Sequence, residues 1–227
     1  MILKLLRFES EISLEPGRVA TLEILNRRLY SRVVASLLSE QGEQALEPYA
    51  LWEVNGKKKA TRGALMVLSS LPAVPLADRM LLSKLYAKLS QALVEDVSRS
   101  VEVAQAAAHL EGLLLEQNIE LWGTYRFGVE WDAAQMLKAF ALRPETDSEE
   151  PLLDQLVSLF GLCADVGLQK PLVLVNAKSF FEPEDLSELA SQAFFYGISL
   201  LLLESWADET KYDWEHKTLI DQWFLEN

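Results

Sequence analysis

The sequence is poor in the residues that build disulfides and zinc sites. Its 227 residues include one cysteine, Cys163, and two histidines, His109 and His216. One cysteine excludes a disulfide within the chain, and one cysteine with two histidines is too small a set for a structural zinc site. Cys163 stands among helically spaced apolar residues, so we interpret it as a small core residue.

Long hydrophobic runs are also missing. Short apolar runs such as Leu200–Leu203 are typical of this chain, whereas a helix that spans a bilayer needs about 20 apolar residues. The first residues, Met1–Glu9, mix charged and apolar side chains and lack the apolar core of a signal peptide. We therefore expect a cytoplasmic protein with no membrane partner.

Motifs of enzyme chemistry are absent or incomplete. Leu200–Glu204 is an apolar strand that ends in an acid, like the second motif of a P-loop NTPase. The glycine-rich phosphate loop that such an enzyme needs is missing, because Asn55–Lys58 lacks both the first glycine and the hydroxyl residue. Neither Cys163 nor a histidine falls in a catalytic motif. We expect no enzyme, and an ATPase that uses Glu204 stays as an alternative hypothesis.

Positive charge is scarce overall and unevenly distributed. The net charge is −13. Residues 1–100 carry 14 Lys and Arg against 11 Asp and Glu, whereas residues 101–227 carry 7 against 23. A strongly acidic total argues against a nucleic-acid partner, but the basic residues are concentrated early in the chain.

The basic residues form three clusters that could contact the phosphates of DNA. These clusters are Arg27, Arg28 and Arg32; Lys57, Lys58, Lys59 and Arg62; and Lys84 and Lys88. Taken alone, each cluster is also compatible with a solvated surface, which is the more ordinary interpretation, and position along the chain does not decide between the two. No recognition-helix signature accompanies them, and any contact should be to the DNA backbone and not to bases. Lys170, in the acidic half, is not expected to contribute.

Four acidic residues indicate a possible calcium site. Glu116 and Glu120 share a helix face, and Glu130 and Asp132 share a strand face. Carboxylates are the hard oxygen ligands that Ca²⁺ prefers, although no EF-hand loop is present. The alternative is that these acids are simply solvated.

Hydrophobic patterning predicts an α/β head domain, residues 1–75 plus 145–227, interrupted by a helical leg domain, residues 76–144. The first part reads as a meander of strands 2–8, 10–14 and 19–25, a helix from Asn26 to Gly42, and a hairpin around Asn55-Gly56 with strands 49–54 and 57–61. The leg reads as one helix over 78–118, a strand over 125–131 and a helix over 133–140.

The last part of the chain alternates helices and strands. We expect helices over 152–166 and 184–196, and strands over 172–175, 198–203 and 218–223, the last at a sheet edge. The apolar strands should be parallel and buried on both faces. The sheet of the head domain is therefore predicted to be mainly parallel.

Several segments resemble one known family in the same order along the chain. Residues 170–189, 196–205 and 219–221 look like the end of the type II-A CRISPR-associated adaptation protein, the Csn2 family. Leu137–Phe140 and Leu81–Tyr86 resemble further segments of it. The C-terminal residues 221–227 depart from the ending of many relatives.

The resemblance implies a head similar to a P-loop NTPase without the nucleotide motif. It also implies a homotetrameric ring that encircles double-stranded DNA, engages its ends and is supported by calcium. The family acts in spacer acquisition with the CRISPR integrase pair and the type II effector nuclease, and it has no established catalytic activity. The competing hypothesis is a protein-only scaffold whose acidic second half binds partners.

Overall fold

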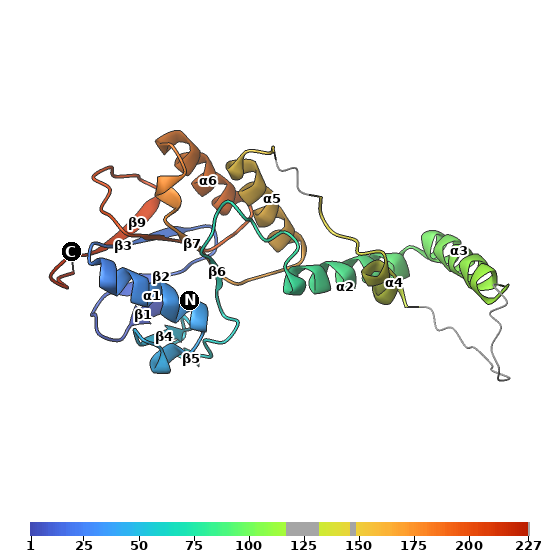
Figure 1. Cartoon of the computed structure of the whole chain (residues 1–227), viewed down its shortest axis with the longest axis horizontal. Helices are drawn as coiled ribbons and strands as arrows, with labels where there is room; N and C mark the ends of the chain where they lie inside the picture. Colours follow the sequence, from blue (N-terminus) through green and yellow to red (C-terminus); the bar gives the residue numbers. More distant parts are fainter. Residues whose placement is uncertain (117–131, 146–148, 227) are drawn as a thin grey trace. The chain divides into compact units, whose positions relative to one another are not determined.

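The chain contains two compact units. The computed structural model describes residues 1–116, 132–145 and 149–226. Contacts group Met1–Leu76 with Thr146–Asn227, which we call the head unit, and separate them from Ala77–Glu145, which we call the helical unit (Figure 1). Each unit is described by itself below.

A five-stranded parallel sheet forms the centre of the head unit. Its strands are, in spatial order, β6 (Met66–Leu68), β7 (Leu172–Val175), β8 (Leu200–Glu204), β3 (Val19–Ile24) and β9 (Glu215–Ile220). All residues of β7 and β8 are buried, as expected for parallel strands that are covered on both faces. The predicted α/β fold with a parallel sheet is confirmed.

A second, antiparallel sheet has the order β2-β1-β4-β5. Its strands are β1 (Ile2–Leu5), β2 (Glu11–Ser13), β4 (Tyr49–Trp52) and β5 (Lys58–Lys59). The predicted meander is wrong in its third strand, because β3 joins the parallel sheet instead. All six residues of β3 are buried, because β8 and β9 pair with both of its edges and the helices on the two sides of the sheet cover its faces (Figure 1).

The predicted hairpin between β4 and β5 is confirmed. Gly56 has a φ of +80°, a backbone conformation that glycine adopts without steric cost. Asn55 supports the turn, since its Oδ1 accepts a hydrogen bond from the Lys57 N–H at 2.9 Å. The hairpin therefore holds the lysines of residues 57–59 at the surface of the head unit.

Helices cover both faces of the parallel sheet. The head unit contains α1 (Arg27–Ser39), η1 (Gly42–Gln44), α5 (Leu152–Asp165), η2 (Ala177–Ser179) and α6 (Pro183–Phe195). Figure 1 shows α1 on one side of the sheet and α5 with α6 on the other. Leu29, Val33 and Leu37 of α1 share one apolar core with both sheets. Cys163 is buried in α5, as predicted.

Two predicted boundaries in the head unit need correction. Asn26 caps α1 as predicted, but the helix ends at Ser39 because Glu40 adopts the left-handed conformation, with a φ of 56°. The helix thus stops before Gly42. The last strand lies at the sheet edge as predicted, but β9 begins at Glu215 and not at residue 218. The short strand β6 was not predicted.

The helical unit contains α2 (Arg79–Glu95), α3 (Val97–Glu116) and α4 (Ala133–Ala139). The prediction of one helix over 78–118 is wrong, because the backbone of Asp96 is extended. The Asp96 carboxylate accepts a hydrogen bond from the Arg99 N–H, so this residue caps a new helix. The predicted strand 125–131 lies outside the described residues. No helix in the described ranges is long and apolar enough to cross a bilayer.

Candidate functional site

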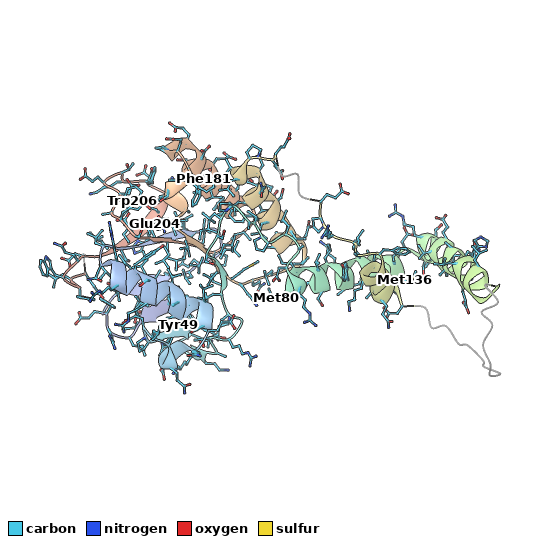
Figure 2. The ribbon with its side chains drawn as sticks, in the orientation of Figure 1. Tyr49, Met80, Met136, Phe181, Glu204 and Trp206 are labelled. Atoms are coloured by element: carbon cyan, nitrogen blue, oxygen red, sulfur yellow. The ribbon has the colours of Figure 1, made fainter. Side chains whose placement is uncertain are left out.

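Two buried carboxylates lie at the carboxyl ends of the central strands. Glu23 of β3 and Glu204 of β8 are partners in the parallel register, and both are 1% exposed or less. Figure 2 labels Glu204 in the interior of the head unit. In open α/β sheets, ligands bind outside this edge. The edge is therefore the first place to look for a functional site.

The ammonium group of Lys178 occupies this edge. Lys178 follows β7, and its side chain is 1% exposed. Its Nζ lies 3.1 Å from a carboxylate oxygen of Asp208, 3.1 Å from one of Glu215 and 3.5 Å from one of Glu23. Burial lowers the pKa of Lys178, but hydrogen bonds and charge from Glu215 and Asp208 outweigh it and raise the pKa. Lys178 is thus a buried, paired cation.

A second lysine completes the cluster. Lys217 Nζ lies 3.2 Å from Glu23 Oε1 and 3.3 Å from Glu215 Oε1. It also donates to the backbone oxygens of Asp208 and Thr210. We call Glu23, Lys178, Glu204, Asp208, Glu215 and Lys217 the edge cluster. Its carboxylates outnumber its cations.

Glu204 is the carboxylate of the edge cluster whose pKa the fold raises. Its pKa is raised to about 7, first by burial and also by the charge of Glu23, although the Lys178 backbone N–H and ammonium lower it. That N–H donates to Glu204 Oε1 at 3.1 Å, while Oε2 has no hydrogen-bond partner among the described residues. Burial and the charge of Glu204 also raise the pKa of Tyr30. Near neutral pH, both the protonated and the ionised form of Glu204 are therefore populated.

The connection between β3 and α1 does not provide a phosphate cradle. Leu25 and Asn26 alone separate the strand from the helix. Asn26 Oδ1 accepts hydrogen bonds from the N–H groups of Arg28 and Leu29, both at 3.1 Å. These amides at a helix N-terminus are the groups that would bind a phosphate. The geometry therefore gives no support to an ATPase that uses Glu204.

The first basic cluster lies on α1. Arg27 and Arg28 are exposed at its first turn. The Arg32 side chain already has partners within the head unit. Its Nη2 donates a hydrogen bond to the Leu46 backbone oxygen at 2.7 Å and lies 3.0 Å from Glu47 Oε2. Glu47 is fully buried. Arg27 and Arg28 are therefore the better phosphate contacts of this cluster.

The second basic cluster lies at the other end of α1. Lys57, Lys58, Lys59 and Arg62 are exposed, and Lys58 pairs with Glu43. Thr61, which lies between Lys59 and Arg62 in the sequence, joins this cluster to the end of α1, because its Oγ1 donates a hydrogen bond to the Glu40 backbone oxygen at 2.7 Å. From Arg28 to Glu40 the helix rises roughly 18 Å. The two clusters thus flank α1.

Lys170 lies beside the second cluster. Its Nζ is 3.5 Å from the position that a Cβ on Gly63 would occupy, and it lines the same cavity as Lys59. The sequence assigned Lys170 to the acidic half because it is far from the hairpin in the chain. Only the folded structure brings it to this surface.

The remaining predicted residues belong to the helical unit. Lys84 and Lys88 are exposed on α2. Of the predicted calcium ligands, Glu120 and Glu130 lie outside the described residues, and of Glu116 only its backbone at the end of α3 is described.

The fourth predicted calcium ligand, Asp132, is exposed and caps α4. Its Oδ1 accepts a hydrogen bond from the Gln135 N–H at 2.6 Å. Within the described ranges, no three metal-ligating side chains gather. The calcium hypothesis therefore depends largely on residues beyond those ranges.

Comparisons with known proteins give one family model and a structural match. The family model described as "CRISPR-associated protein (Cas_Csn2)" matches residues 51–222. The solved structure titled "Crystal structure of Stu0660 of Streptococcus thermophilus" superimposes with a TM-score of 0.58 at 11% identity, over 97% of this chain and 74% of that one. Among curated proteins, none matches the sequence. At this identity, the structural likeness shows the fold alone.

Removal of the central cation should destabilise the head unit strongly. Lys178→Met removes the ammonium nearest to the carboxylates of Asp208 and Glu215 and one of the two ammonium groups beside Glu23, and we expect a loss of about 3–5 kcal/mol in the free energy of unfolding. Urea denaturation measures it. Lys211→Met, an exposed lysine close in sequence to Asp208, is the matched control and should change stability by less than about 0.5 kcal/mol. Equal effects of the two substitutions would contradict the role of Lys178.

Replacement of Glu204 by Gln should change how stability depends on pH. The fold raises the pKa of Glu204 from its ordinary value of 4.5 to about 7. The folded state therefore holds this proton more tightly, and ionisation of Glu204 lowers stability as the pH rises between these values. Glu204→Gln stays neutral, so its stability relative to the wild type should rise from pH 5 to pH 8 by up to roughly 3 kcal/mol.

The difference between the two proteins is the informative quantity. Other acids titrate in both and cancel. Burial raises the pKa of Asp208, but hydrogen bonds from Thr210 and the nearby Lys178 lower it overall, and its contribution to stability is therefore lost as the pH falls. Urea denaturation at each pH gives the comparison, and a constant difference from pH 5 to pH 8 would refute the prediction.

Proposed function

The chain belongs to the Csn2 family of CRISPR-associated proteins, and from this premise we propose that it binds double-stranded DNA, including DNA ends, as a homotetrameric ring in spacer acquisition. In this proposal it works with the CRISPR integrase pair and the type II effector nuclease. It contributes binding and not catalysis. The ring is held together with the help of Ca²⁺.

The observation that carries the proposal is the exposed basic surface of the head unit. Arg27 and Arg28 at one end of α1, and the lysines of residues 57–59 at the other, are exposed in a chain whose net charge is −13. Exposed Lys and Arg that neutralise phosphates give binding that is independent of base sequence. This surface is therefore suited to the DNA backbone.

Several copies are needed to surround a duplex. One chain of 25.6 kDa is too small to enclose DNA, whose diameter is about 20 Å. In a ring, the basic surfaces of the copies face one channel, and the acidic surfaces face outward. Assembly thus turns an uneven charge distribution into a positive channel.

The edge cluster supports a binding function without nucleotide hydrolysis. The cation at the carboxyl edge of the sheet is Lys178, which belongs to the chain itself. Glu204, the acid that would organise Mg²⁺ in an ATPase, is 0% exposed. Both observations favour a head that keeps its parallel sheet for structural support.

DNA binding should fall steeply with salt and should not depend on sequence. We expect the slope of log K against log salt to lose about 0.9 for each phosphate contact removed. The test variant is Arg28→Ala, Lys57→Ala, Lys84→Ala and Lys88→Ala together, measured by fluorescence anisotropy with linear duplexes. Arg32 is left intact because it pairs with the buried Glu47. Lys211→Ala is the control that should keep the wild-type slope.

Topology gives a second readout in the same experiment. A closed ring can thread onto a linear duplex but has to open to load onto a covalently closed circle. Equal affinity for both forms would exclude threading. No binding to either form at low salt would favour the protein-only scaffold.

Calcium should stabilise the tetramer. If Ca²⁺ is present at about 100 times its dissociation constant, the melting temperature should rise by roughly 5–10 °C, and light scattering should give about four times 25.6 kDa. The combined variant Glu116→Gln, Glu120→Gln, Glu130→Gln and Asp132→Asn should lose this rise. Asn also caps helices, so α4 keeps its N-cap.

Glu111→Gln on α3 is the control for the calcium experiment and should keep the full rise in melting temperature. An unchanged rise in the combined variant would place the ions elsewhere. A monomer at every calcium concentration would refute the ring.

A further inference from the structure

A cavity lies at the amino end of the parallel sheet, opposite the edge cluster. Its volume is about 570 Å³, within the range of small-molecule sites. It is lined by Met1, the connection from β2 to β3, the β4–β5 hairpin, the end of α5 with its connection to β7, and the connection from α6 to β8. All of them belong to the head unit.

Two lysines give the cavity a positive charge. Lys59 comes from the hairpin and Lys170 from the segment before β7. Glu53 is the only acid among the described residues that line the cavity. Its carboxylate already accepts a hydrogen bond from Asn55 Nδ2 at 3.0 Å. The cavity is thus suited to an anion.

The rest of the lining is apolar and aromatic. Leu14, Leu168 and Ile198 contribute side chains, and Tyr196 contributes its ring. This ring lies against α5, since a Cβ on Gly161 would be in van der Waals contact with Tyr196 Cε1 at 3.6 Å. Inorganic phosphate would use only the lysines. A phosphate joined to a flat nucleoside would use the whole cavity.

We propose that this cavity binds a nucleoside 5′-monophosphate. The phosphate lies between Lys59 and Lys170, and the nucleoside packs against Tyr196 and the apolar wall. The same chemical group occurs in a free nucleotide and at the 5′-phosphorylated end of a DNA strand. The second source rests on the proposed DNA binding, whereas the first does not.

Calorimetry with deoxyadenosine 5′-monophosphate and with deoxyadenosine tests the first source. We expect the wild-type chain to bind the nucleotide at least about tenfold more tightly than the nucleoside, because the lysines recognise the phosphate. Lys59→Gln and Lys170→Gln should each remove most of this preference. Lys211→Gln, an exposed lysine away from the cavity lining, should keep it.

Short linear duplexes with a 5′-phosphate or a 5′-hydroxyl test the second source. The readout is the ratio of the two affinities, because the two lysines also affect the general attraction to DNA. A preference for the 5′-phosphate that Lys59→Gln and Lys170→Gln abolish assigns the cavity to strand ends. A preference for the free nucleotide alone assigns it to a soluble ligand.

Failure of the cavity and failure of the proposed function give different results. The cavity proposal is overturned if the chain prefers neither the nucleotide over the nucleoside nor the 5′-phosphate duplex over the 5′-hydroxyl duplex. It is also overturned if a preference for the phosphate persists in both lysine variants. The proposed function fails if no duplex binds, and the calorimetric experiment still decides on the cavity in that case. Lys59 is exposed on a two-residue strand, so Lys59→Gln should retain the fold.

Discussion

The head unit depends on one buried ammonium group, that of Lys178. Its three carboxylate partners come from β3, from β9 and from the segment between β8 and β9. β9 lies at the sheet edge, and only two of its six residues are buried, so apolar burial alone gives it little support. The Thr21 hydroxyl adds a hydrogen bond of 2.7 Å to Glu215. Ion pairs with Lys178 and Lys217 therefore add to the backbone pairing that holds β9 against β3.

This arrangement fills the place where such a fold ordinarily binds its ligand. The carboxyl edge of a parallel sheet ordinarily receives the ligand, but here Lys178 fills that edge, and Asn26 caps the helix terminus that would hold a phosphate. The amino end of the same sheet has an open cavity with two lysines, and α1 is flanked by exposed cations. The parallel sheet is thus closed at its usual ligand edge, and the exposed cations of the head unit lie elsewhere.

Local signals were sufficient for much of the fold. The apolar run of β7, the Asn55-Gly56 turn and the cap at Asn26 depend on neighbouring residues, and each is confirmed. The sheet to which β3 belongs depends on β8 and β9, which follow much later in the chain. The edge cluster and the place of Lys170 depend in the same way on distant partners. Glu204 was recognised from its strand, but its raised pKa depends on burial within the folded sheet and on the charge of Glu23, which the sequence does not connect to it.

The acidic total does not prevent phosphate binding, because charges act over short distances in salt. The Debye length is about 8 Å at physiological ionic strength, less than half of the roughly 18 Å that α1 rises between its basic ends. A phosphate beside Arg28 therefore responds mainly to nearby side chains. Glu47 is the acid closest to Arg32, and it is buried between this residue and Arg7. The charge of Glu47 is thus neutralised inside the fold, and the exposed cations at both ends of α1 act on the potential beside them.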